Sequence, residues 1–101
     1  MGRVDNVVVY DHYVYYSYVA KIEFFQNILA NALEIKKYMK TGYDYLLNGG
    51  CSYGGKTFVE VEYNNCIIDL DYIICRSQAY IEKLEKALAS YKDTAVMPDT
   101  R

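Results

Sequence analysis

The chain has 101 residues, of which 52% are hydrophobic and 24% are charged, and its formal net charge at pH 7 is −2. These values are typical of one small globular domain and exclude a disordered or fibrous chain. They also argue against direct nucleic-acid binding, which would require a basic face. We expect a single domain over residues 1–92, followed by a flexible tail over residues 93–101.

No stretch of the chain approaches the ~20 apolar residues of a membrane span. The N-terminal run of Val and Tyr is interrupted by Asp5, Asp11 and His12, unlike the apolar core of a signal peptide. We therefore expect a cytoplasmic protein without membrane contact, whose three cysteines are reduced thiols.

Residues 4–18 are dense in β-branched and aromatic side chains, with Asp11-His12 between two such runs. This composition favours two strands joined by a turn, so it predicts an N-terminal β-hairpin. Both faces of that hairpin would be apolar, so we expect it either to be covered on both sides or to form the edge of an oligomer. Tyrosine is enriched at interfaces, so four tyrosines are predicted to form a homo-oligomer interface. They are Tyr10, Tyr13, Tyr15 and Tyr16.

Between residues 19 and 40 the hydrophobic period becomes that of a helix, and Gly42 is positioned to end it. Residues 41–55 contain five of the six glycines and predict a loop. Ser77 predicts the N-cap of a last helix that continues to about Lys92.

Residues 56–75 contain two runs of alternating hydrophobic and polar residues that meet at Asn64-Asn65. A period of two is typical of a half-buried strand, and Asn tolerates the positive φ of a tight turn. The segment therefore predicts a second β-hairpin, in which Glu60 lies opposite Asp69.

The expected fold class is α+β: an antiparallel sheet of two hairpins with two helices packed on it, in the order ββα-loop-ββα. The alternative is a long helical hairpin that bends near residues 53–55. A stripe with helical spacing supports it: Phe58, Val61, Ile68, Tyr72, Cys75, Ala79 and Leu88. That layout is similar to the small secreted WXG100 proteins, but the chain has no tryptophan, and its many β-branched residues in this region favour the sheet.

Residues 50–57, GCSYGGKT, match the pattern GxxxxGK[ST] letter for letter. Over this segment alone the chain resembles the Walker A loop of P-loop nucleotidases. The resemblance implies that backbone N–H groups wrap a phosphate, that the lysine reaches its terminal oxygens and that the threonine binds Mg²⁺. The chain has no room for the βαβ units of that family, so we expect at most binding of a phosphate or nucleotide without hydrolysis. The residues concerned are Gly50, Gly54, Gly55, Lys56 and Thr57.

Four carboxylates would share the solvent face of the second predicted hairpin: Glu60, Glu62, Asp69 and Asp71. Like charges opposed across strands are destabilising, and either solvent and salt or a basic partner would relieve them. Carboxylates repeated along a hairpin can take the places of nucleic-acid phosphates in a basic groove, as in small acidic inhibitors of nucleases, including phage anti-defence proteins.

The leading hypothesis is therefore a non-enzymatic inhibitor or adaptor that docks this acidic face on a basic partner, such as a nuclease. The alternatives are a protein that binds a small phosphorylated ligand through residues 49–57 and a structural subunit of an oligomer. His12 is the only histidine, and no two cysteines form a CxxC pair. We expect no catalytic residue, no metal site and no cofactor.

Overall fold

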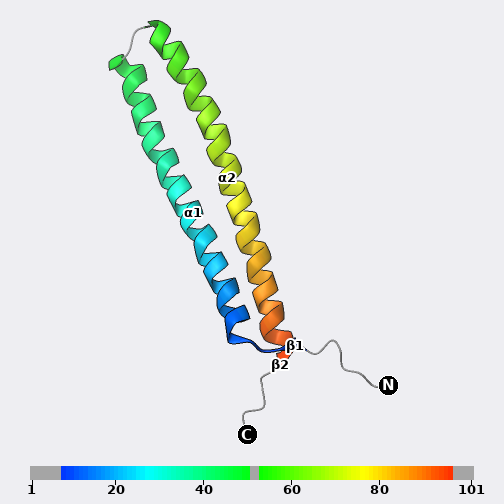
Figure 1. Ribbon diagram of the computed structural model, residues 1–101. Coiled ribbons are helices and arrows are strands. Elements are labelled where there is room, and N and C mark those ends of the chain that lie inside the picture. Colours follow the sequence, from blue (N-terminus) through cyan, green and yellow to red (C-terminus); the bar gives the residue numbers. More distant parts are fainter. Residues whose placement is uncertain (1–7, 51–52, 97–101) are drawn as a thin grey trace.

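The computed structural model describes residues 8–50 and 53–96, which form a long antiparallel pair of helices (Figure 1). Helix α1 (His12–Tyr45) is followed by a wide π-type turn, η1 (Leu46–Gly50), and by helix α2 (Tyr53–Thr94). The chain measures 77 × 26 × 15 Å along its principal axes. The molecule is therefore a rod, and its core is the seam between the two helices.

The seam is built from residues that recur every three or four positions in both helices. Those of α1 are Tyr15, Tyr18, Ile22, Phe25, Leu29, Ala32, Lys36, Met39 and Tyr43, and all are at least partly buried. Those of α2 are Val59, Tyr63, Ile67, Leu70, Ile74, Ser77, Ile81, Leu84, Leu88 and Tyr91, also at least partly buried. This spacing keeps one narrow face of each helix turned toward its partner, as in an antiparallel coiled coil.

Contacts along the seam set the register of the two helices. The Tyr43 and Tyr63 rings stack with their centroids 4.0 Å apart, and the Phe25 and Tyr80 rings stack at 4.8 Å. The same register places Ala32 at the level of Ile74, and it places Leu29 at the level of Ser77. A small residue therefore lies beside a large one in each of these layers, which allows the helices to approach closely.

Polar contacts join the helix ends at the pole opposite the turn. The Asp11 side chain accepts a hydrogen bond of 2.8 Å from the Tyr13 N–H and caps α1. Strand β1 (Val8–Val9) pairs in parallel with β2 (Ala95–Val96), and the Tyr91 hydroxyl binds both the N–H and the carbonyl of Asp11. The two ends of the described chain are thereby held together (Figure 1).

The turn at the other pole depends on one glycine. Gly49 has a φ of 128°, in the region that side chains with a Cβ rarely adopt, and Asn48 also leaves helical geometry. These two residues break the helical geometry after α1, where the chain turns toward α2.

The expected α+β fold is wrong, and the alternative of a long helical hairpin is confirmed. The bend expected near residues 53–55 is wrong, because those residues begin α2 and the helical geometry breaks earlier, at Asn48 and Gly49. Residues 56–75 lie inside α2, and Asn64-Asn65 is part of that helix rather than a turn. The alternation that suggested strands has a different cause. Helix α2 carries one row of apolar residues toward α1 and a second row on its opposite face. In the sequence, the residues of one row fall between those of the other, which gives an alternating pattern. The N-terminal hairpin is also wrong where the structure describes it, because Asp11 caps α1 and His12 begins it.

Both predicted helices lie within longer ones. The segment 19–40 is the middle of α1, and Gly42 does not end that helix. Ser77 is not an N-cap but a residue with 3% exposure in the middle of α2. Of the predicted tail, residues 93–96 belong to α2 and β2, and residues 97–101 lie outside the described part.

Candidate protein-interaction surface

The face of α2 that points away from α1 carries a second row of apolar residues. We call it the outer stripe; its members are Phe58, Val61, Ile68, Tyr72, Cys75 and Ala79, spaced by three, four or seven positions. An α-helix turns by roughly 100° per residue, so this row lies about half a turn from the seam. Ile68 and Tyr72 are 65% and 67% exposed, whereas the seam residue Ile74 is only 8% exposed.

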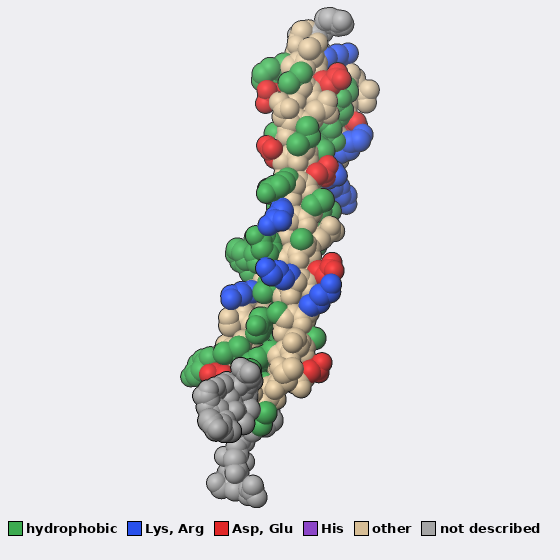
Figure 2. Space-filling model, turned by 90° about the vertical axis from the view of Figure 1, so that its right-hand side faces the viewer, with side chains coloured by type: hydrophobic (Ala, Val, Ile, Leu, Met, Phe, Trp, Pro, Cys, Tyr) green, Lys and Arg blue, Asp and Glu red, His purple; other side chains and the backbone are tan. Residues whose placement is uncertain are grey.

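Exposed hydrophobic side chains are distributed along the length of the rod. Figure 2 looks at the molecule from the side on which α2 lies, and hydrophobic groups appear between charged ones over most of its length. A helix that is apolar on both faces is normally buried on both, so α2 resembles an internal helix more than a surface helix.

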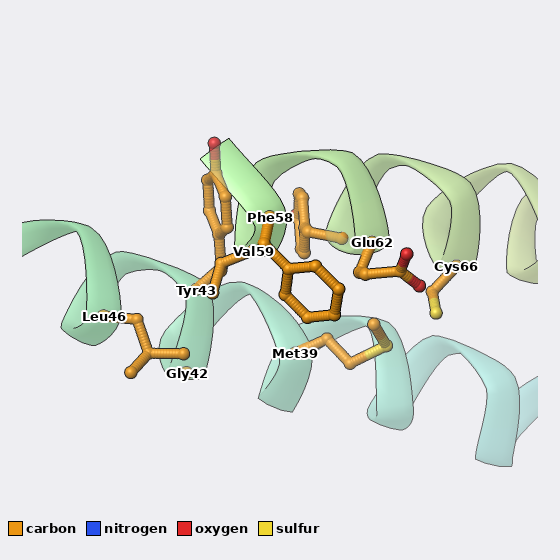
Figure 3. A pocket seen from close by; sticks show the side chains of 9 residues that line it. Met39, Gly42, Tyr43, Leu46, Phe58, Val59, Glu62 and Cys66 are labelled. Carbon is orange, nitrogen blue, oxygen red and sulfur yellow. The ribbon is translucent and has the colours of Figure 1, made fainter. Parts of the chain in front are cut away.

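A groove adjoins the outer stripe near the turn. It has a volume of about 300 Å³ and lies between the last turns of α1 and the first turns of α2. Its lining is almost entirely apolar: Met39, Gly42, Tyr43, Leu46, Phe58, Val59, Glu62, Tyr63 and Cys66. The Phe58 ring is directed toward Met39 across this groove (Figure 3). Phe58 therefore belongs to both the groove and the outer stripe.

One edge of the outer stripe is charged in a regular way. The four residues of this charged edge recur every seventh position: Glu62, Asp69, Arg76 and Lys83. The two acidic members lie nearer the turn and the two basic members lie nearer the chain ends. The Arg76 guanidinium donates a hydrogen bond of 2.9 Å to the Tyr80 hydroxyl and also lies over that ring. In the part of the chain that the structure describes, none of the four forms an ion pair.

The four carboxylates that were predicted to share a sheet face are divided by the helix. Glu60 and Asp71 lie on one side of α2, and Glu62 and Asp69 lie on the other. Asp71 also accepts a hydrogen bond of 2.6 Å from the Lys36 ammonium of α1, which raises the pKa of that lysine above its ordinary value of 10.5. The four side chains therefore do not form one acidic surface.

The glycine-rich segment lies at the start of α2. Gly54, Gly55, Lys56 and Thr57 occupy the first turns of that helix, Gly50 ends η1, and residues 51–52 lie outside the described part. In P-loop proteins a strand precedes the phosphate-binding loop, whereas here α1 and η1 precede it. Ligand binding by this segment stays a prediction.

The N-terminal tyrosines separate into two pairs. Tyr10 packs within the chain, with its ring centroid 6.1 Å from that of Tyr15 and 5.9 Å from that of Tyr91. Burial, followed by the neighbouring tyrosines, raises the pKa of Tyr10 above 10.0. Tyr13 and Tyr16 are exposed. Of the predicted oligomer-interface tyrosines, these two present most of their surface to solvent.

The described residues contain no group of His, Cys, Asp or Glu side chains that could hold a metal ion. The His12 ring lies edge-on to Tyr16 with centroids 4.5 Å apart, and Cys66 and Cys75 are free and exposed. Across residues 8–50 and 53–96, neither helix is apolar enough over a sufficient length to cross a membrane.

Comparison with protein-family models, with curated proteins and with solved structures gives no match to this chain.

The helical stripe noted in the sequence contains all six residues of the outer stripe and also Leu88, which lies in the seam, but it was assigned no role. Its residues served only as support for the helical alternative. The signal that was overlooked is that one segment contains two apolar rows, each with a spacing of three and four residues. Helix α1 can cover only one of these rows. The second row then becomes a candidate interface.

Proposed function

We propose that this protein is a non-enzymatic interaction protein, an antiparallel helical hairpin that binds other helices through its outward faces. The observation that carries the proposal is the outer stripe, which extends over about 32 Å of α2 if each residue adds ~1.5 Å. Its largest members are half to two-thirds exposed. Rows of large exposed apolar side chains of this kind often mark an interaction site.

The outward face of α1 adds to this support. It exposes a comparable set of large side chains: Tyr13, Tyr16, Phe24, Ile35, Tyr38 and Tyr45. The rod therefore presents apolar rows on two opposite sides, while its own core is the single seam between the helices. A protein with this distribution buries more surface in an assembly than it does alone.

The helical partner is preferred to the basic partner suggested by the acidic residues. Docking on a basic groove needs several carboxylates on one surface. Here Glu60 and Asp71 point to the side opposite Glu62 and Asp69, and Asp71 is already paired with Lys36.

Photo-cross-linking in the cells that produce the protein tests the proposal. A photoreactive phenylalanine analogue would replace Tyr72 in the outer stripe, and a control would carry it at the exposed Lys37 of α1. We expect cross-linked protein products from position 72 and few from position 37. A position 72 that gives no more product than position 37 would contradict the proposal.

A further inference from the structure

The order of charges along α2 restricts which partner helix would fit the outer stripe. The charged edge runs from Glu62 and Asp69 to Arg76 and Lys83, each seven residues from the next. Positions seven apart lie on the same edge of a helical interface and contact the corresponding edge of a partner helix. In the described part of this chain no opposite charge pairs with this edge. A partner with complementary charges must carry basic groups toward the turn and acidic groups toward the chain ends.

A second copy of α2 in antiparallel orientation has this order of charges. Reversing the helix places Glu62 beside Lys83 of the partner subunit and Asp69 beside Arg76 of the partner subunit. Both pairings define the same midpoint, between Tyr72 and Ile73, so one two-fold axis satisfies them together. A shared axis is what an isologous dimer requires, because each contact then occurs twice.

The apolar side chains fit an axis one residue further along. Pairing Ile68 with Ala79 of the partner subunit and Tyr72 with Cys75 of the partner subunit places the midpoint between Ile73 and Ile74, about 1.5 Å along the helix from the midpoint of the charge pairs. Each layer then combines a large and a small side chain, as the seam does with Ala32 and Ile74. Ile68 and Tyr72 are about two-thirds exposed in the single chain, so their burial would supply the stabilisation.

The surface area of the chain is consistent with such a dimer. Its accessible surface is 7783 Å². A compact monomer of 11.7 kDa exposes roughly 5,900 Å². The excess follows from the elongated shape, and a stable interface of standard size would bury roughly 800 Å² of each partner.

We propose that the outer stripe binds a second copy of this chain, antiparallel and across a two-fold axis near Tyr72, with the charged edge specifying the orientation. This inference rests on the proposed function, since it names the helix that the outer stripe binds. The interface leaves the outward face of α1 free.

Charge-reversed variants and their mixture test this arrangement. The first variant, Glu62→Lys with Asp69→Lys, makes the charged edge entirely basic; the second, Arg76→Glu with Lys83→Glu, makes it entirely acidic. Sedimentation equilibrium should show a dimer for the natural protein. Each variant should have a dimer dissociation constant raised more than tenfold, because like charges then face each other. An equimolar mixture of the two variants should again form dimers.

A matched control for the first variant carries the same change of net charge elsewhere. Glu23→Lys with Glu34→Lys places two lysines on α1, away from the charged edge, and should dimerise as the natural protein does. Circular dichroism should show unchanged helix content in all three variants, so that loss of dimer is not loss of fold. High salt should weaken the natural dimer and strengthen the self-association of each variant.

Three results would overturn the inference: a natural protein that stays monomeric at high concentration, a dimer indifferent to both reversals, and an open-ended polymer. The proposed function would survive any of them if position 72 cross-links to a different protein in cells. It would fall together with the inference only if position 72 cross-links to nothing.

Discussion

Lys36 is the one charged residue in the seam row of α1. Its ammonium lies 2.6 Å from the Asp71 carboxylate, and both side chains are nearly half exposed. An ion pair that is this accessible contributes little to stability because solvent screens it. A single polar residue in an otherwise apolar seam instead favours one register over its neighbours. We therefore assign Lys36 and Asp71 to the alignment of the two helices.

The pair predicts a pH dependence. The hydrogen bond to Asp71 raises the pKa of Lys36 in the folded chain above 10.5, the ordinary value that applies to the unfolded chain. The pair therefore stabilises the folded chain fully while the pH is below 10.5. This stabilisation is lost as the pH rises through the higher pKa of the folded chain. The difference in melting temperature between the natural protein and Lys36→Met should therefore stay constant from neutral pH to pH 10.5 and shift in favour of the variant above it. Thermal unfolding followed by circular dichroism measures this. Ionising tyrosines affect both proteins alike, so a difference that is independent of pH would contradict the role of the pair.

Two glycines should respond in opposite ways to the same substitution. Gly49→Ala places a Cβ on a residue with φ of 128°, which should cost about 1–3 kcal/mol of unfolding free energy. Gly42→Ala lies within α1 with nothing within 4 Å of the added Cβ, and should add about 0.5–1 kcal/mol. Urea denaturation of both variants checks the pair of signs. Equal effects at the two positions would show that Gly49 does not determine the turn.

At the scale of the helix, α2 differs from a surface helix because its two opposite faces are both apolar. Ile74 and Ile68 illustrate this, since they lie six residues apart in the same helix and are 8% and 65% exposed. The seam face holds α1, whereas the outer stripe has no cover from the chain itself. The two faces should therefore contribute differently to stability.

The same substitution on the two faces separates these contributions. Ile74→Ala should destabilise the chain by about 2 kcal/mol or more, because it removes buried methyl groups from the seam. Ile68→Ala in dilute solution should change stability by less than about 0.5 kcal/mol. Both changes alter helix propensity equally, so the difference reports burial. Chemical denaturation at low and high protein concentration measures it, and only Ile68→Ala should reduce the concentration dependence. An equal loss for both variants at low concentration would contradict the assignment of the two faces.

The sequence predicted the helix over residues 19–40 correctly but predicted strands over residues 56–75, and the difference has a physical reason. The segment 19–40 was predicted as helix because α1 is polar between its apolar rows there, so one helical period dominates. In residues 56–75 the seam row and the outer stripe interleave, and their sum alternates like a strand. Intrinsic preferences added to the error, because Val, Ile and Tyr are frequent in this segment and favour strands when nothing else decides. A seam along both helices overrides those preferences. It becomes visible in sequence only when the two halves of the chain are aligned in opposite directions.

The candidate surface was within reach of the same reasoning. The residues of the outer stripe have helical spacing, and the charged edge repeats every seventh position, so both are readable from sequence once α2 is treated as one helix. The groove beside Phe58 and Met39 was not predictable, because it depends on how the last turns of α1 meet the first turns of α2.

At the scale of the molecule, the shape allows the dimer to be distinguished from other assemblies. The chain has a radius of gyration of 22.6 Å, against roughly 13 Å for a compact domain of similar length. Helix α2 runs from Tyr53 to Thr94, so its midpoint lies next to the proposed axis near Tyr72. Two copies related by that axis overlap almost completely along the rod. A dimer of this kind doubles the mass while adding little length.

Small-angle X-ray scattering measures both quantities on one sample. For the natural protein at dimer-forming concentration, we expect twice the monomer mass, a maximum dimension close to that of the monomer and a larger cross-sectional radius. The variant Glu62→Lys with Asp69→Lys provides the monomeric reference, because it keeps the chain length and the helices while its charged edge repels. A maximum dimension near twice the 77 Å of the single chain would indicate contact through the rod ends instead. In that case the apolar faces of the rod would remain uncovered, and the charges along α2 would have no part in assembly.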